Sequence, residues 1–148
     1  MAHVTERVGA YSELIVEASL IASGYLHVSR PATNEYYDLS ATDRLTGEHV
    51  TFQVKTLKRR TDRDDSLVLV ARRGDGSKYE VDEAADYYVG VLVDDGEIPR
   101  VFLMKNRNIS EYWASEASAG ERWVELPLAL DRGTLMDEIT SIPEGKVS

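Results

Sequence analysis

The chain has 148 residues, no cysteine and a formal net charge of -9 at pH 7. This length suits one domain, and the lack of cysteine excludes a disulfide framework, a thiolate zinc site and a cysteine nucleophile. Its apolar runs fall far short of the roughly 20 residues that span a bilayer, and its N-terminus lacks a secretion signal, so we expect an intracellular, cytoplasmic protein.

The first predicted element is a helix over residues 4–22, which ends at Ser23 and Gly24. Apolar residues recur there at spacings of three and four, and we expect this stripe to face the core. The stripe consists of Val4, Val8, Tyr11, Ile15, Ala18 and Ala22. A helical wheel puts Glu13 nearly opposite the stripe, on the solvated side.

Two strands joined by a turn are predicted next, over residues 37–42 and 50–55, because apolar and polar residues alternate in both. If the turn is centred between Leu45 and Thr46, the numbers of facing residues sum to 91, and Asp38 faces Gln53. Lys55 shares their face, because side chains two apart on a strand point the same way.

The remaining predicted elements are strands over residues 66–73, 87–93 and 100–104, a helix over 108–120, a short strand over 122–128 and a last helix over 133–142. Asp82 and Asp86 precede one of these strands and are expected to cap or turn the chain. We find no repeat and no linker. The sequence therefore predicts a single domain over residues 1–148, with a core over about 5–120 and a C-terminal extension over about 121–148.

The charge is unevenly distributed along the chain. An acidic total speaks against a nucleic-acid partner, but residues 53–78 hold eight basic residues against four acidic ones. Within this window Lys58, Arg59 and Arg60 are consecutive, and we call them the basic strip. Two interpretations stay open: a surface that binds a phosphate backbone, or a solvated loop.

A carboxylate, an amide and an ammonium group are thus predicted to meet on one face of the hairpin. Asp38 and the amide oxygen of Gln53 are hard oxygen ligands suited to Mg²⁺, which could polarise a phosphodiester and activate water. Lys55 could position that water or offset charge on the phosphate. The alternative is an ordinary cross-strand pair on a solvated surface, and spacing alone does not decide between the two.

At these residues the sequence resembles the PD-(D/E)xK nuclease superfamily, most closely its group I intron homing endonucleases, with Holliday-junction resolvases next. The likeness covers about residues 9 to 104 and lies in four blocks, which read "GAYSELIVEASLIASGY", "YYDL", "FQVKT" and "ADYYVGVL". Four blocks in order at plausible gaps are a more specific signal than one motif.

The resemblance implies an α/β, restriction-endonuclease-like fold with a mixed central β-sheet flanked by helices. It implies a catalytic set of Glu13, Asp38, Gln53 and Lys55. It further implies that Asp38, the Val54 carbonyl, Gln53 and Glu13 bind Mg²⁺ or Mn²⁺. Glu13 and Val54 enter the set on the resemblance alone.

The expected activity is Mg²⁺-dependent hydrolysis of DNA by a homing-endonuclease-like enzyme, with the basic strip binding DNA. A Holliday-junction resolvase-like nuclease is one alternative. A nuclease-like module that binds nucleic acid or protein without cutting is another, of a different class. One small domain carries one active site, and cutting both strands of a DNA duplex requires two sites. We therefore expect a homodimer or a homotetramer.

Overall fold

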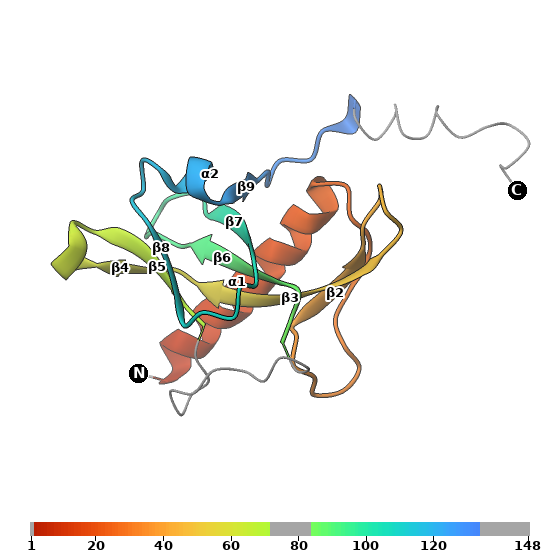
Figure 1. Ribbon diagram of the computed structural model, residues 1–148, viewed down its shortest axis with the longest axis horizontal. Helices are drawn as coiled ribbons and strands as arrows, with labels where there is room; N and C mark the ends of the chain where they lie inside the picture. The colour runs from red at the N-terminus through yellow and green to blue at the C-terminus, as the bar shows by residue number, and fades with distance from the viewer. Residues whose placement is uncertain (1, 72–83, 134–148) are drawn as a thin grey trace, which may run out of the picture.

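The computed structural model describes residues 2–71 and 84–133. A long helix packs on one face of a six-stranded sheet, and a three-stranded sheet packs on the other (Figure 1). The helices are α1 (Ala2–Ala22) and α2 (Ala119–Arg122), with a 3-10 turn at Thr61–Arg63. No helix in these two ranges is both long and apolar enough to cross a membrane.

The large sheet has the strand order β1-β2-β3-β6-β7-β9. Its strands are β1 (Leu26–Ser29), β2 (Leu39–Thr42), β3 (His49–Thr56), β6 (Tyr87–Leu92), β7 (Arg100–Lys105) and β9 (Val124–Leu126). Only β3 and β6 pair in parallel, so the sheet is mixed. The second sheet is antiparallel, in the order β4 (Lys58–Arg60), β5 (Ser66–Val70) and β8 (Glu111–Ala114).

The predicted hairpin register is confirmed. Leu39 pairs with Phe52 and Thr42 with His49, so facing numbers sum to 91. The turn between the strands is held by Asp43, whose Oδ1 accepts hydrogen bonds from the backbone N–H groups of Leu45 and Thr46, at 2.8 and 3.1 Å. Short aspartate side chains favour such turns, and the turn fixes which residues of the two strands meet.

Helix α1 is confirmed, but the prediction of its buried face is wrong in part, since Ile15 packs on the core as expected and other members of the stripe do not. Val4 and Tyr11 of the predicted stripe are exposed, while Val16 and Leu20 are fully buried against the sheet. Two serines share this buried face. The hydroxyl of Ser12 hydrogen-bonds Thr56 and that of Ser19 donates to the Pro127 carbonyl, both at 2.8 Å. Because these hydroxyls have partners, serine can line a helix face packed on the core.

The predicted helix over residues 108–120 is also wrong. This segment forms strand β8, followed by a turn and the four-residue α2. Tyr112 and Ala114 face the core while Trp113 is exposed, so the alternation of a strand prevails over helical spacing. The predicted strand over 122–128 is confirmed as β9. The predicted helix over 133–142 lies almost wholly outside the described residues.

The two faces of the large sheet bury separate apolar clusters. Side chains of α1, β2, β3, β6 and β7 form the first, including Leu39, Phe52 and Val89. The second lies between the sheets and includes Leu57, Leu69 and Tyr112. At Gly90 the layers approach so closely that an added Cβ would lie 2.7 Å from Leu57 Cδ2. Glycine in β6 therefore permits this packing.

Candidate functional site

Asp38 immediately precedes β2, and its backbone and its side chain both bond to β3. Its N–H donates to the Phe52 carbonyl, with 2.9 Å between N and O. Its Oδ2 accepts a hydrogen bond from the N–H of Val54 at 2.7 Å. The carboxylate thus accepts the hydrogen bond of Val54 in place of a backbone carbonyl, just before the antiparallel pairing begins with Leu39 and Phe52.

The backbone carbonyl of Val54 points to the same side of β3 as its N–H, toward Asp38. In a strand the N–H and the C=O of one residue face the same neighbouring strand, because paired residues exchange both bonds. Since the N–H of Val54 reaches Asp38, its carbonyl oxygen also points toward the beginning of β2. This direction agrees with a role for the Val54 carbonyl as an oxygen ligand.

Gln53 and Lys55 flank Val54 on the opposite face of β3 from α1. Phe52 packs in the cluster against α1, so the alternation of the strand turns Gln53 and Lys55 to the other face. Both are half-buried. Gln53 lies beside Tyr88 and Lys55 beside Gly90 in the parallel register. The ammonium of Lys55 is close enough to Asp38 to lower the pKa of its carboxyl.

Glu13 belongs to the same electrostatic cluster. It precedes Val16 by three residues and Leu20 by seven, so it borders the buried face of α1. Arg30 holds it at 3.8 Å. The charge of Asp38 raises the pKa of Glu13, while Arg30 lowers it. The solvated position expected from the wheel was wrong because the wheel was centred on the outward stripe.

Partial burial dominates the ionisation of both carboxyls. Desolvation raises the pKa of Asp38, against the opposing effects of the Val54 N–H, Lys55 and Arg30. Desolvation also raises the pKa of Glu13, and the Asp38 charge adds to it. Two half-buried carboxylates that are destabilised as anions form a place where a cation would be favoured.

The available donors suit a hard divalent cation. The carboxylates of Asp38 and Glu13, the Gln53 amide oxygen and the Val54 carbonyl are all oxygen ligands of the kind that Mg²⁺ and Mn²⁺ accept. Within residues 2–71 and 84–133, no group of three or more His, Cys, Asp or Glu side chains gathers as a ligand cluster. Neutral oxygens would therefore have to complete the shell.

The basic strip is largely neutralised by neighbouring acids. The guanidinium of Arg59 bonds Asp94 at 2.6 Å and Glu116 at 2.8 Å. Arg60 bonds Asp62 at 3.0 Å and lies 3.6 Å from Glu111. Lys58 is exposed and forms no ion pair with a described residue. Of the three predicted DNA-binding residues, only Lys58 keeps its charge available.

The sheet register brings Lys58 into one row with Trp113, and sequence reasoning missed the cation that lies beside this ring. Lys58 pairs with Val68, which pairs with Trp113, so the three form one row across the second sheet. Trp113 is 45% exposed, and the guanidinium of Arg122 lies 4.1 Å from its ring centroid. This is cation–π geometry. The outer face of the second sheet therefore carries the Trp113 ring with Lys58 in the same row and Arg122 against the ring.

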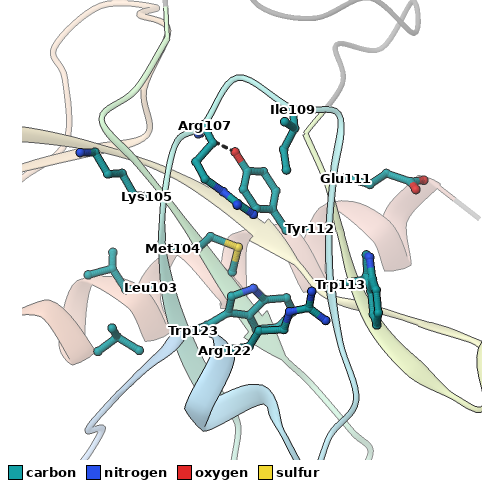
Figure 2. A pocket seen from close by; sticks show the side chains of 11 residues that line it. Leu103, Met104, Lys105, Arg107, Ile109, Glu111, Tyr112, Trp113, Arg122 and Trp123 are labelled. Carbon is teal, nitrogen blue, oxygen red and sulfur yellow. Dashed lines mark hydrogen bonds between the residues drawn. The ribbon is translucent and has the colours of Figure 1, made fainter.

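Trp113 and Arg122 also line a pocket of about 420 Å³ between β7, β8 and α2 (Figure 2). Arg107 and Tyr112 stand at one end, where the N–H of Arg107 donates to the Tyr112 hydroxyl at 2.8 Å. Within the described chain, Lys105, Arg107 and Arg122 form no ion pair. Lys105 and Arg107 are neighbours in the sequence, but Arg122 and Trp113 come from later elements, so no local motif could have linked the four.

Asp86 has a structural role, but it links two strands and does not cap or turn the chain as expected. Its Oδ2 accepts hydrogen bonds from the N–H and the hydroxyl of Thr51, at 2.9 and 3.1 Å, and its own N–H donates to that hydroxyl. These bonds tie the start of β6 to β3. Asp82 lies outside the described residues.

Comparison with known proteins gives one informative likeness. No protein-family profile and no curated protein matches the chain. The structure is similar to that of the bacterial homing endonuclease I-Ssp6803I, with a TM-score of 0.58 and 18% identity, over 76% of this chain and 78% of that one. At this identity the likeness establishes the fold alone. The expected α/β fold, a mixed central sheet with flanking helices similar to a homing endonuclease, is confirmed.

Proposed function

We propose that the protein is a Mg²⁺-dependent endonuclease that hydrolyses phosphodiester bonds in DNA. The observation that carries this proposal is the placement of Asp38 against Val54, between Gln53 and Lys55, with Glu13 close by. The likeness to a homing endonuclease fold supports it. We further propose that this site is of the PD-(D/E)xK type.

Each residue would have a separate task. Asp38, Glu13, Gln53 and the Val54 carbonyl would hold the ion, which when bound polarises the phosphate and lowers the pKa of water. The ammonium of Lys55, near Asp38, would orient the attacking water or offset charge that builds on the phosphate. The Val54 N–H keeps the Asp38 carboxylate in place, and Arg30 restrains Glu13.

DNA contacts would come from cations without acidic partners. Lys58 is one, and Lys105, Arg107 and Arg122 around the pocket are others. Such groups release counterions when they bind phosphates, whereas Arg59 and Arg60 already have carboxylate partners. Cutting both strands requires two copies of a single-site domain, so a symmetric homodimer or homotetramer is part of this proposal.

The test is cleavage of supercoiled plasmid, linear duplex and a four-way junction, with Mg²⁺, Mn²⁺ or a chelator. We expect nicking that requires metal, is abolished in Asp38→Asn and falls by at least a hundredfold in Lys55→Ala. Asp95→Asn, in an exposed turn, is the matched control and should cut normally. Preference for the junction would favour the resolvase alternative.

The non-catalytic alternative makes a different prediction. The two-carboxylate site motivates it, since a shell with few charges binds metal weakly. A protein that binds these DNAs but leaves all of them intact with either metal would establish that alternative. Equal cleavage by Asp38→Asn and the unmodified protein would overturn the site assignment instead.

A further inference from the structure

Helix α1 is apolar on two sides, and only one of them is covered by the protein's own sheet. The outward side carries six residues at alternating spacings of three and four, which we call the outer seam: Val4, Arg7, Tyr11, Leu14, Ala18 and Ile21. All six are exposed, with 60% of Val4, 58% of Leu14 and 50% of Ile21 accessible. An apolar side of a helix is normally buried against a partner.

The spacing of the outer seam is that of the a and d positions of a coiled coil. It runs through almost three heptads of a helix of 21 residues. The only charged residue among the six is Arg7. The sequence stripe that we expected in the core, which shares Val4, Tyr11 and Ala18 with the seam, is thus a second packing surface of the same helix.

The outer seam is complementary to itself when two copies run antiparallel. Facing numbers then sum to 25, which opposes Val4 to Ile21 and Tyr11 to Leu14 and gives the long Arg7 the small Ala18. A surface that matches its own copy about a two-fold axis is what a closed symmetric dimer requires. The pairing is centred between Ser12 and Glu13, near the middle of the helix.

The surface of the helix is shaped for such packing. A hollow of about 270 Å³ is lined by Val4, Arg7, Val8 and Tyr11. These positions are i, i+3, i+4 and i+7, the four residues that surround a side chain from a partner helix in knobs-into-holes packing. In the antiparallel register the hollow faces Ala18 and Ile21 of the second copy.

We propose that two copies of this chain associate through antiparallel packing of their α1 helices along the outer seam. The inference rests in part on the proposed function, which includes a symmetric oligomer, and names its interface. Its test measures mass and cross-linking, so its failure leaves the cleavage test unaffected. A helix of 21 residues is about 30 Å long, so this strip alone gives an interface of small to standard size. The dimer should therefore dissociate measurably on dilution.

Sedimentation of the full chain over a wide concentration range tests the association. We expect a monomer–dimer equilibrium, with a dissociation constant that rises at least tenfold in Leu14→Glu. Leu45→Glu is the control, because Leu45 is 86% exposed in a turn away from the seam. Circular dichroism should show both variants folded. A monomer at every concentration would overturn the proposal and leave another segment or partner to cover the seam.

Cross-linking tests the orientation. The chain has no cysteine, so each introduced thiol is unique. We expect Val4→Cys protein mixed with Ile21→Cys protein to form a disulfide-linked heterodimer on mild oxidation, because the antiparallel register brings these positions together. Neither protein alone should cross-link efficiently. Efficient self-linking of Val4→Cys, with no heterodimer, would mean parallel packing and would overturn the proposed arrangement.

Discussion

The carboxylate of Asp38 accepts a hydrogen bond from the backbone N–H of Val54, with 2.7 Å between Oδ2 and N. Because Val54 lies between Gln53 and Lys55, this bond fixes a carboxylate next to an amide and an ammonium group on the neighbouring strand. A hydrogen bond to the ionised form lowers the pKa of Asp38, but burial outweighs it. Burial therefore destabilises the ionised form of Asp38, and this should affect the stability of the protein and its response to pH and metal.

We expect Asp38→Asn to stabilise the metal-free protein at neutral pH. The folded-state pKa of Asp38 is raised, so the folded state binds the proton more tightly and stability falls as pH rises from the unfolded value of about 4 through the raised value. Asparagine can still accept the Val54 N–H bond but carries no charge. The melting temperature at pH 7 should therefore increase.

Two controls accompany that measurement. The gain in Asp38→Asn should shrink as the pH falls from the raised folded-state pKa toward about 4, and it should be absent below that, where the carboxyl is protonated in both states. Adding Mg²⁺ should raise the melting temperature of the unmodified protein and leave the variant unchanged. A variant that is less stable than the unmodified protein at pH 7 would contradict the assignment of Asp38 as a destabilised anion.

Gln53 should set how tightly the metal binds. Gln53→Glu keeps the side-chain length and adds a charge, so we expect activity at lower Mg²⁺ and a larger stabilisation by the metal. Gln53→Leu has a similar size without a ligand oxygen and should lose cleavage at ordinary Mg²⁺ concentrations. Titration of nicking and of melting temperature with Mg²⁺ measures both. Normal metal dependence in Gln53→Leu would make this residue part of an ordinary strand surface.

Lys58 and Arg59 are adjacent cations with different environments, and they should differ in their effect on DNA binding. Lys58→Ala should weaken binding to all sequences and reduce the slope of log affinity against log salt by about 0.9, because one phosphate contact is lost. Arg59 is bonded to Asp94 and Glu116, so Arg59→Ala should change the slope little. Binding titrations at several salt concentrations compare them. Equal effects would mean that DNA displaces the acidic partners of Arg59.

Gly90 should tolerate no side chain. An added Cβ would lie 2.7 Å from Leu57 Cδ2 and 3.3 Å from Leu69 Cδ1, and both leucines are buried. We expect Gly90→Ala to destabilise the fold by about 1 to 3 kcal/mol, as overpacking of a core does. Gly9→Ala, where nothing lies within 4 Å of the added Cβ, is the control for glycine replacement. Chemical denaturation measures both, and an unchanged midpoint in Gly90→Ala would contradict this packing.

The hairpin could be predicted from sequence because its information is local. Alternation over residues 37–42 and 50–55, together with the turn at Asp43, determines the register in which Leu39 faces Phe52, and this register brings Asp38 next to Val54. A one-residue shift would have exposed Leu39 and Phe52, so hydrophobic burial permits a single register. Three residues of the candidate site were therefore accessible without a structure.

Tertiary packing determined which side of α1 is buried and which cations are neutralised, and the local sequence pattern could predict neither. Which side of α1 is buried depends on the hydroxyl partners of Ser12 and Ser19, which come from β3 and from the segment after β9. The burial of this side of α1 also places Glu13 near Asp38 and leaves the outer seam exposed. Likewise, carboxylates from distant loops neutralise Arg59. A helix with two apolar sides is ambiguous by itself, because periodicity reports that a face can be buried but not which partner buries it.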